Sequence, residues 1–579
     1  MTTQASDREQ DRRFSAVDSA LADLDRGVGI WERTPLSARR LLLARVHALT
    51  ATYAHDWVQA SAGIKGLPED SPLTGEEWTS GPYTLLTALA TVIDSLRARE
   101  RGRSPVDGLR FGTAPGGRTT LRILPHGPVD RLILNGYRAD VWMKPGISAD
   151  AVRAQAGLAE SDTGRESGIG AVLGAGNVSS IPLLDALHEL FTANRVALVK
   201  LNPVTDPLLG VFSAILRPLI EHGVLRLVTG AAEVGNYLAH HPLVAHVHVT
   251  GSVHTHDAIV FGTGPEGAAR RRAGDPLLTK PISSELGGVS PVIVLPGAWS
   301  KADLRFQAEN LASQRLHNNG YNCIATQVVV ISSDWAQKHQ FLAELRSALS
   351  RAPQRAAYYP GSDQRIAAVL DSGAAAERLE GDRVLVGPLP ATDESSSVKG
   401  LFTTEFFGPA LGVVTLPGDG GEFLSSAVTL VNQEISGTLG AGVIAHPATL
   451  RDLGPRFETE LARMHYGCIG VNVWIGLGYQ LPTVPWGAFP GNELTDVGSG
   501  IGTVHNGLFL RDPERTVIRG PFRPAPRSLL AGEFSLAPPR PPWFVTNRTA
   551  AATGAALTAF AAKPAWDRLP RIVLSALRG

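Results

Sequence analysis

Hydrophobic residues along the chain follow two different spacings. In residues 14–60 and 82–100, Leu, Ala and Val recur at helical intervals between charged residues, which predicts α-helices. Between residues 119 and 148, short β-like runs alternate with Pro-Gly and Asn-Gly turn signals, which predicts a hairpin. We therefore expect the chain to open with helices that lead into a hairpin.

After the hairpin, strand-like and helix-like runs alternate. The strand-like runs "GIGAVLGAG", "VALVKLNP" and "VAHVHVTGS" are separated by helix-like runs such as "IPLLDALHELFTAN" and "PLLGVFSAILRPLIEHG". A second series starts near residue 286, with "VSPVIVL" and "ATQVVVIS" on either side of a helix expected at 301–316. This alternation predicts parallel sheets with crossover helices, which bind nucleotides at the carboxyl ends of their strands. The expected fold class is α/β, with two α/β lobes.

These patterns divide the chain into six segments. They are a helical N-terminal part (1–118), the hairpin (119–148), a nucleotide-binding α/β domain (149–284), a second α/β domain (285–483), a return segment with a late strand (484–521), and a Pro-rich linker followed by an Ala-rich helical tail (522–579). Pro564 and Pro570 break the tail into short amphipathic pieces. We expect the tail to pack on the protein, and binding to a membrane surface is the alternative.

The composition of the chain mainly excludes certain classes of protein. The 54 basic and 54 acidic residues cancel, whereas a nucleic-acid-binding surface or an acidic tail leaves an imbalance. Two cysteines far apart in sequence, Cys323 and Cys468, favour a reducing cytoplasm over a disulfide framework. The polar N-terminus lacks the apolar core of a signal peptide, and no uninterrupted apolar run reaches the roughly 18 to 20 residues of a spanning helix. We expect a soluble, cytoplasmic protein with no nucleic-acid partner.

One of the two cysteines lies at a turn. Cys323 ends the stretch "LHNNGYNC", between a helix-like run and a strand-like run. Structural cysteines sit among apolar side chains, so a thiol beside glycine and amides indicates chemistry. Cys468, in the apolar run "YGCIGVNVWIG", is expected to have a packing role.

Two other side chains suit such chemistry. Asn177, in "GAGNVSS", follows a strand and could donate its amide to an oxyanion, although capping a helix is the alternative. Glu285 is the only acid in the apolar stretch "TKPISSELGGVSPVIV", where partial desolvation would raise its pKa and suit a general base. A salt bridge or a bond to turn amides is the structural alternative for Glu285. A serine stands where a dinucleotide fingerprint has its third glycine, so "GAGNVSS" does not predict a usual Rossmann loop.

Several motifs in order resemble the aldehyde dehydrogenase superfamily. They are "VTGS", "SSELGGVSP", "NNGYNC" and "TEFFGPAL", together with "ALVKLNP" and "VPWGAFPGNELTDVGSGIG". The resemblance covers roughly residues 120–520. It implies an enzyme that oxidises a small-molecule aldehyde to a carboxylic acid with NAD or NADP as cofactor.

The resemblance assigns three catalytic residues. Cys323 matches the nucleophile, whose thiolate attacks the aldehyde to give a thiohemiacetal and then a thioester. Asn177 matches the amide that stabilises the oxyanion together with the Cys323 N–H. Glu285 matches the base that activates water to hydrolyse the thioester.

The resemblance also assigns the cofactor-binding residues. Lys200 matches the lysine that binds the adenosine ribose, and Gly251 and Ser252 match the turn where the pyrophosphate meets a helix N-terminus. Glu405 matches the residue that holds the nicotinamide ribose, and Phe407 matches the aromatic residue beside it. No metal site is expected, because His246, His248, His254 and His256 share a segment that already has a strand and a phosphate turn to form.

Departures from the family pattern keep alternatives open. Asn177 and Pro182 are separated by "VSSI", a longer loop, which keeps a CoA-acylating dehydrogenase or acyl-CoA reductase as the first alternative. A non-catalytic scaffold is the second. "KLNPVTD" has no acid where NAD-preferring members carry one, so NADP stays possible. His317 lies six residues before Cys323, which suggests a Cys-His hydrolase as a further interpretation. The Glu285 pattern competes with that interpretation.

The resemblance finally implies a homodimer or homotetramer. In the family, the hairpin and a late strand extend the sheet of a neighbouring subunit. Here the late strand is expected at "ERTVIRG", residues 514–520.

Overall fold

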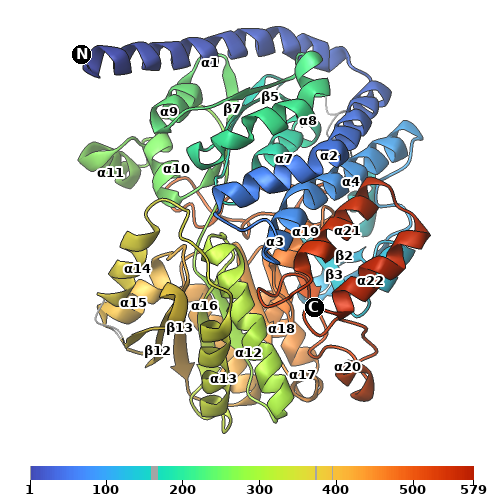
Figure 1. The fold of residues 1–579 in the computed structure, drawn as a ribbon, viewed down its shortest axis with the longest axis vertical. Helices are drawn as coiled ribbons and strands as arrows, with labels where there is room; N and C mark the ends of the chain where they lie inside the picture. Colours follow the sequence, from blue (N-terminus) through green and yellow to red (C-terminus); the bar gives the residue numbers. More distant parts are fainter. Residues whose placement is uncertain (1, 158–166, 372–374, 394) are drawn as a thin grey trace.

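Two β-sheets organise the two halves of the protein in the computed structural model, which describes residues 2–157, 167–371, 375–393 and 395–579. The smaller sheet lies in the upper half of Figure 1 and the larger sheet lies in the lower half. The α/β fold class with two lobes, predicted from the alternation of strands and helices, is confirmed.

The six-stranded sheet forms the first half. Its strands, in spatial order, are β16 (Gly500–Ile501), β8 (Ile282–Leu286), β7 (Val244–Gly251), β4 (Ile169–Leu173), β5 (Val196–Lys200) and β6 (Leu225–Val228). The strands from β8 to β6 run parallel, and β16 is antiparallel to β8. Because parallel strands are buried on both faces, β4 and β5 are apolar at nearly every position.

Helices cover this sheet and connect its strands. They include α7 (Ile181–Leu187), continued by η3 (His188–Thr192), then α8 (Leu209–Glu221), α9 (Ala232–His240) and α10 (Val253–Val260). The N-terminal helices α1 (Thr2–Arg33), α2 (Leu36–Ile64) and α4 (Thr84–Glu100) pack on the same half, with α1 across the top of Figure 1. The helices predicted for the first hundred residues are therefore present.

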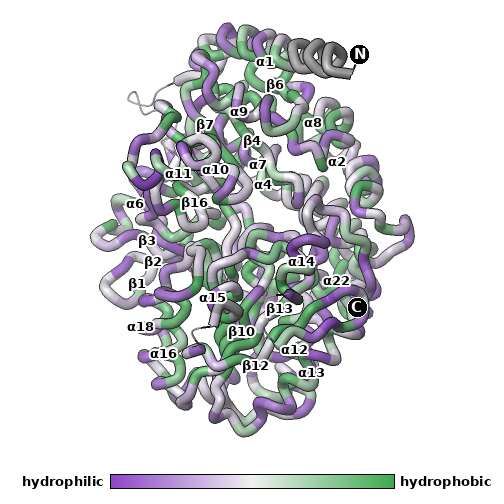
Figure 2. The backbone as a smooth tube through the Cα atoms, turned by 90° about the vertical axis from the view of Figure 1, so that its left-hand side faces the viewer, coloured by the Kyte–Doolittle hydropathy of each residue, from purple (hydrophilic) through white to green (hydrophobic). Residues whose placement is uncertain are grey.

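The eleven-stranded sheet forms the second half. Its strands, in spatial order, are β1 (Arg110–Ala114), β2 (Arg118–Leu124), β3 (Arg138–Met143), β17 (Pro513–Arg519), β15 (Cys468–Val471), β14 (Gly440–Ile444), β9 (Ser290–Val294), β10 (Thr326–Ser332), β13 (Ala410–Leu416), β12 (Val384–Pro390) and β11 (Ala376–Arg378). The tube in Figure 2 is strongly hydrophobic along β10. The helices α12 (Lys301–Leu316) and α13 (Lys338–Arg351) lie on this half, and α12 has the bounds expected from the sequence.

The hairpin and the late strand differ from expectation. The hairpin segment is a three-stranded unit that starts at Arg110, earlier than residue 119. The late strand β17 pairs antiparallel with β3 and parallel with β15, so it joins the hairpin to the sheet of its own chain. Both edges of β17 are thus paired within the chain, and the expectation that it extends a neighbour's sheet in an oligomer stays a prediction.

The last sixty residues pack on the body of the protein. The Pro-rich segment is held by Arg523, which bonds to Asp303 at 2.9 Å, and by the Phe522 carbonyl, which accepts from Gln307 Nε2 at 2.7 Å. The tail forms α21 (Ala550–Ala562), η7 (Trp566–Arg568) and α22 (Leu569–Leu577), beside α2 and α4 in Figure 1. It contacts α3 (Thr74–Trp78) and the following η1 (Thr79–Tyr83), so the tail packs on the protein as expected.

One helical stretch approaches the length of a membrane span, although Asp206 and Arg217 interrupt its apolar run. Among the described residues, Pro203–Glu221 is long and apolar enough to pass a length and composition test for a membrane span. The buried face of its α8 part, which includes Phe212, Ile215 and Leu219, belongs to the core around the six-stranded sheet.

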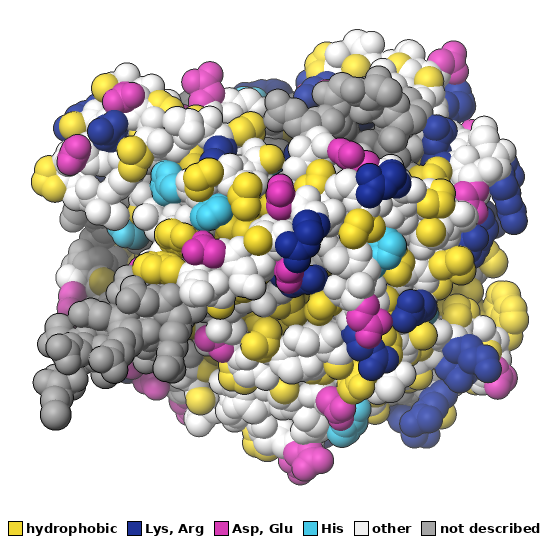
Figure 3. All heavy atoms as spheres, turned by 90° about the horizontal axis from the view of Figure 1, so that it is seen from above, with side chains coloured by type: hydrophobic (Ala, Val, Ile, Leu, Met, Phe, Trp, Pro, Cys, Tyr) yellow, Lys and Arg dark blue, Asp and Glu magenta, His cyan; other side chains and the backbone are white. Residues whose placement is uncertain are grey.

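Basic and acidic side chains are interspersed on the face seen in Figure 3, in keeping with the balanced charge.

Candidate active site

The turn that carries Cys323 joins α12 to β10 and has an unusual backbone. Asn318 and Asn319 both adopt φ of 53°, and Gly320 follows with φ of 79°. This left-handed region suits asparagine and glycine, which explains why these residue types precede the cysteine. The Asn318 N–H donates to Glu76 Oε2 at 2.9 Å, and the Asn318 amide donates to the Tyr321 carbonyl at 3.1 Å. The turn is therefore fixed by buried hydrogen bonds.

Cys323 and Glu285 meet directly. Cys323 Sγ donates to Glu285 Oε1 at 3.0 Å, and Trp486 Nε1 donates to the same oxygen at 3.1 Å. Burial, and next the negative charge of Glu285, raises the pKa of the Cys323 thiol well above its ordinary value. Burial also raises the pKa of Glu285, against the hydrogen bonds from Cys323 and Trp486, which lower it. The Cys323 thiol therefore keeps its proton and donates it in a hydrogen bond to the Glu285 carboxyl group.

Asn177 lies next to this pair. Its Nδ2 donates to the Tyr321 carbonyl at 2.9 Å, while its own carbonyl accepts from Asn318 Nδ2 at 3.0 Å. Asn177 therefore binds the cysteine turn on both sides, and it lines the same cavity as Cys323. The alternative role as a simple helix cap is not what the hydrogen bonds show, because the residue before α7 is Ser180.

A cavity of about 820 Å³ lies between the two halves of the molecule. Its lining includes all eight side chains or turns assigned from the sequence: Asn177, Lys200, Gly251, Ser252, Glu285, Cys323, Glu405 and Phe407. Cys323, Glu405 and Phe407 come from the second half, and the other five come from the first. The cavity thus lies where the two halves meet, at the carboxyl ends of the parallel strands β4, β5, β7 and β8.

The far end of the cavity suits a nucleotide. Lys200 ends β5, and burial lowers its pKa while Asp206 and Glu233 oppose that change. Ser252 caps α10, accepting from Thr255 N at 3.1 Å, so the positive end of this eight-residue helix faces the cavity rim. A cation and a helix N-terminus at one end match the adenosine and pyrophosphate of a dinucleotide.

The near end suits a ribose. Glu405 has a buried oxygen, Oε1, without a hydrogen-bond partner, and burial raises the pKa of this carboxyl to about 8. A Cβ at Gly287 would lie 2.2 Å from Glu405 Oε2, so a larger residue at that turn would displace the Glu405 carboxyl group. Phe407 beside it has φ of 41°, and its carbonyl accepts from Arg365 at 3.3 Å. The residues present fit NAD or NADP, with the unsatisfied carboxylate oxygen available to ribose hydroxyls.

Sequence reasoning missed three residues that matter for the site. Trp486, which bonds to Glu285, lay within a quoted motif, but its indole N–H gave no signal of its own. Glu76 holds the cysteine turn from the distant N-terminal helices, and only the fold reveals that contact. Glu233 lines the cavity on α9 and lies near Lys200, so a second element places an acid beside this lysine.

The residues to which the sequence assigns no catalytic or metal-binding role make other contacts. His317 packs against Trp474, with ring centroids 4.6 Å apart and the rings tilted by 49°, and burial lowers its pKa to about 4. Cys323 bonds instead to Glu285. Cys468 is buried in β15, and burial raises its pKa to about 12. Within the described ranges, no group of three His, Cys, Asp or Glu side chains is placed to hold a metal ion.

Comparisons with known proteins agree on one family. The model of the aldehyde dehydrogenase family matches residues 180–487. Peroxisomal aminoaldehyde dehydrogenase 2 of Malus domestica is 30% identical over 300 residues, 48% of this chain and 52% of that protein. The 1-pyrroline-5-carboxylate dehydrogenase of Geobacillus thermodenitrificans is 26% identical over 340 residues, 56% of this chain and 61% of that protein. The chain spans about half the length of the first of these relatives.

Solved structures share the fold. A mutant of aldehyde dehydrogenase C from Pseudomonas syringae, in complex with NAD+ and octanal, superposes with a TM-score of 0.56 at 17% identity. The match covers 88% of this chain and 90% of that one. The family model covers more than half of the chain, and the chain belongs to the aldehyde dehydrogenase family.

Proposed function

We propose that this protein oxidises an aldehyde to a carboxylic acid with NAD or NADP, through a thioester on Cys323. The observation that carries the proposal is the 3.0 Å contact between Cys323 Sγ and Glu285 Oε1 at the inner end of a nucleotide-sized cavity. A thiol paired with a base supports covalent catalysis, and the cavity supports hydride transfer to a dinucleotide.

Acylation begins with proton transfer. Glu285 takes the proton of the Cys323 thiol while sulfur attacks the aldehyde carbon, so a C–S bond forms and the carbonyl oxygen becomes an oxyanion. The Cys323 N–H and the Asn177 amide, which lines the same cavity, stabilise that oxyanion. The bound cofactor supplies the hydride acceptor that converts the thiohemiacetal to a thioester. Lys200, Ser252 and Glu405 hold and orient it.

Deacylation uses Glu285 a second time. Once the carboxylate is free of the thiol proton, it deprotonates a water molecule that attacks the thioester carbonyl, and the C–S bond breaks. Trp486 supports this role, because its N–H holds the carboxylate 3.1 Å away and stabilises the ionised form. This arrangement favours water over CoA as the acceptor of the acyl group.

The test is absorbance of reduced cofactor with a panel of aldehydes, with and without CoA. We expect aldehyde-dependent reduction of NAD or NADP without CoA, and complete loss of it in Cys323→Ser. Strict dependence on CoA would favour the acylating alternative. No turnover with any aldehyde would favour the scaffold alternative, and full turnover in Cys323→Ser would overturn the mechanism.

We also propose a cytoplasmic homo-oligomer. Both Cys323 and Cys468 are free thiols, which supports a reducing compartment. Sedimentation of the purified protein measures the assembly: a dimer or tetramer supports the proposal, and a monomer at micromolar concentration contradicts it.

A further inference from the structure

A serine and a buried histidine meet on one face of the six-stranded sheet. The strands β7 and β8 are paired so that His248 lies opposite Ser283, and His248 Nδ1 is 2.8 Å from Ser283 Oγ. Ser283 is partly buried, whereas His248 is 1% exposed. A hydroxyl within hydrogen-bond reach of an imidazole is the pairing that activates a serine as a nucleophile.

Asp185 of α7 lies behind this histidine. His248 Nε2 is 3.1 Å from Thr250 Oγ1 and 3.5 Å from Asp185 Oδ2, and Thr250 Oγ1 donates to Asp185 Oδ2 at 2.8 Å. Burial alone would raise the pKa of Asp185, but attraction to His248 and next to His505 holds this pKa well below its usual range. Asp185 is therefore a carboxylate.

These contacts determine where the protons lie. The Thr250 hydroxyl gives its one proton to the carboxylate, so its oxygen accepts from His248 Nε2. In the neutral imidazole the proton therefore sits on Nε2, and the lone pair of Nδ1 faces the Ser283 hydroxyl. Ser283, His248 and Asp185 thus have the order of nucleophile, base and orienting carboxylate that defines a catalytic triad.

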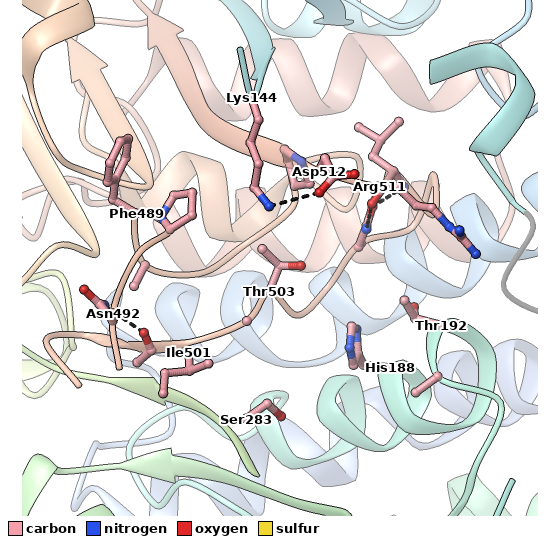
Figure 4. A pocket seen from close by; sticks show the side chains of 18 of the residues that line it. Lys144, His188, Thr192, Ser283, Phe489, Asn492, Ile501, Thr503, Arg511 and Asp512 are labelled. Atoms are coloured by element: carbon pink, nitrogen blue, oxygen red, sulfur yellow. Dashed lines mark hydrogen bonds and ion pairs between the residues drawn. The ribbon is translucent and has the colours of Figure 1, made fainter. Parts of the chain in front are cut away.

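Ser283 lines a second cavity, which is separate from the cofactor cavity. Its volume is about 730 Å³, and Figure 4 shows Ser283 on its wall, across from the ion pair of Lys144 and Asp512. Among the described residues, its lining shares no member with that of the cofactor cavity. Gly502 forms the wall beside the serine, where a Cβ would lie 3.5 Å from Ser283 Cβ. A ligand in this cavity therefore reaches Ser283 without contact to Cys323.

The wall of the second cavity suits a small neutral ligand. Two of its basic side chains already face acids: Lys144 Nζ is 2.9 Å from Asp512 Oδ1, and Arg195 Nε is 2.6 Å from Glu189 Oε2. Part of the lining is apolar and includes Phe489, Ile501 and Leu510. The volume lies in the range of pockets that hold small organic molecules.

We propose that Ser283, His248 and Asp185 form a second catalytic site, which hydrolyses small neutral carboxylic esters in this cavity. Ser283 and His248 are its catalytic residues, and Asp185 is a positioning residue that acts through His248. The activity goes beyond aldehyde oxidation and does not rest on it, because it uses neither Cys323 nor the cofactor.

The hydrolysis has two steps and consumes one water molecule. Ser283 Oγ attacks the ester carbonyl carbon and gives its proton to His248 Nδ1, so a new C–O bond forms. The ester C–O bond then breaks, and the leaving alcohol takes the proton from Nδ1. Water next gives a proton to Nδ1 and attacks the acyl-serine, and Ser283 leaves with that proton. Each oxyanion faces a wall that includes the Thr503 hydroxyl.

The neutral form of His248 is the active one. Burial alone would lower the pKa of this imidazole, but attraction to Asp185, and next to Glu189 and Glu285, raises it above the ordinary value. Hydrolysis should therefore increase as pH rises through this pKa. The titratable groups around His248 and Asp185 on the packed elements also include His188, His246, Tyr479 and His505.

A fluorophosphonate probe tests the nucleophile. A bond forms between phosphorus and Ser283 Oγ, the P–F bond breaks, and the serine proton leaves through His248 with the fluoride. The full-length parent is treated at pH 9 and digested, and mass spectrometry locates the adduct. We expect the adduct on Ser283, with a rate of labelling that falls by at least about tenfold in Asp185→Asn.

Ser284→Ala is the matched control for the labelling. Ser284 is the next residue on β8, so its side chain points to the opposite face of the strand, and its Oγ accepts from Ile501 N at 3.1 Å. This variant should be labelled on Ser283 at the rate of the parent.

Turnover of p-nitrophenyl acetate separates the two sites. The Cys323 thiolate displaces nitrophenolate in a burst, and the steady rate that follows measures hydrolysis of the acetyl thioester. The contribution of Cys323 is the difference between a protein and its Cys323→Ala form, and the rate left in Cys323→Ala belongs to the second site. We expect the remaining rate to fall by at least about tenfold when Ser283→Ala is added.

The pH profile separates positioning from a structural role. In Asp185→Asn the carboxylate that raises the pKa of His248 is gone, so the acid limb of the labelling rate should move to lower pH. A residue with only a structural role would change the rate without moving this limb, and that result would overturn the role of Asp185.

Two results would overturn the second site as a whole. One is a parent that carries no adduct on Ser283, and the other is a steady rate in Cys323→Ala that stays the same when Ser283→Ala is added. Failed aldehyde oxidation together with an adduct on Ser283 would overturn the oxidoreductase function alone and would support the second site.

Discussion

The side chains of Glu285 and Trp486 determine where the proton of the Cys323 thiol resides. Both partners of the 3.0 Å contact have raised pKa values, because burial disfavours the thiolate and the carboxylate alike. The proton therefore stays on sulfur until an aldehyde arrives, and the nucleophile is protected from side reactions. In the proposed mechanism Glu285 must then act as a base. The hydrogen bond from Trp486 Nε1 supports this role because it stabilises the ionised carboxylate.

Trp486→Phe tests that task. The indole N–H stabilises the ionised carboxylate, so its removal should raise the pKa of Glu285 further. Since Glu285 acts when deprotonated, the acid limb of the pH–rate profile for deacylation should move to higher pH, by about one unit. The steady rate of ester hydrolysis between pH 5 and 9 measures it. An unshifted limb would mean that Glu285 does not act as the base.

Glu405→Gln tests the carboxyl at the ribose end. Burial raises the pKa of Glu405 to about 8, so the folded protein holds a proton that the unfolded chain releases above its ordinary pKa of 4.5. The stability linked to this proton is present below pH 4.5 and is lost as pH rises through 8. Glutamine cannot ionise, so the melting temperature of the variant relative to the parent should rise between pH 5 and 8, by about 1 °C or more.

The same variant should bind cofactor more weakly, because an amide NH2 group replaces one of the two carboxyl oxygens that face the ribose hydroxyls. Thermal melts at both pH values and titration with NAD and NADP provide the two readouts. Equal melting differences at pH 5 and pH 8 would contradict the buried, protonated state of Glu405.

Residue types near reactive turns were predictable, and long-range partners were not. Cys323 and Glu285 carry a signal because a thiol among amides and an acid among apolar residues are out of place in a sequence. Asp185 carries none, since an acid in an ordinary amphipathic helix suggests a solvated face. His248 was discounted as a metal ligand, and its pairing with Asp185 depends on a sheet register that no local pattern fixes.

At the level of elements, α3 connects the tail to the cysteine turn. Glu76 on one side of α3 accepts from the Asn318 N–H, and Gly75 lies against the backbone of Ala550 in α21. The sequence suggested a helical tail but not its position, because the residues it touches lie more than four hundred positions earlier. Packing of α21 should therefore influence the reactivity of Cys323.

Gly75→Ala tests this connection. A Cβ at Gly75 would lie 2.4 Å from the Ala550 carbonyl carbon, and such overpacking costs about 1–3 kcal/mol. We expect a lower melting temperature and a slower nitrophenolate burst, because α3 shifts and Glu76 moves with it. Gly63→Ala in α2 is the control: nothing lies within 4 Å of its Cβ, and alanine there should stabilise by about 0.5–1 kcal/mol. A parent-like burst in Gly75→Ala would contradict the connection.

The late strand β17 was predicted from the sequence, but its pairing partners were not. Residues 513–519 form a strand, as expected for "ERTVIRG". Whether a strand pairs within its chain or with a neighbour depends on which sheet edge lies within reach, and alternating hydrophobicity says nothing about that choice. In this chain β17 closes the interval between β3 and β15, so any oligomer must use other surfaces or exchange this unit as a whole.

For the whole molecule, the remaining choice is between a tail that packs and a tail that also binds membranes. Ala550, Leu569 and Ile572 are buried, whereas Trp566, Leu574 and Leu577 are 66%, 51% and 47% exposed. The buried set supports packing on the body. The exposed set is the surface that would contact a membrane. Packing and membrane binding are therefore measured on the same pair of proteins.

The pair is the full-length chain and a chain that ends at residue 545. Truncation uncovers the face of α3 that carries Gly75 and removes the apolar contacts of α21 and α22, so the melting temperature should fall by several degrees. Both proteins should stay in the supernatant when vesicles with anionic lipid are pelleted, because Val573 and the three exposed side chains named above bury too little area for stable binding. Pelleting of the full-length chain alone, with equal melting temperatures, would show instead that the tail serves a membrane and not the enzyme body.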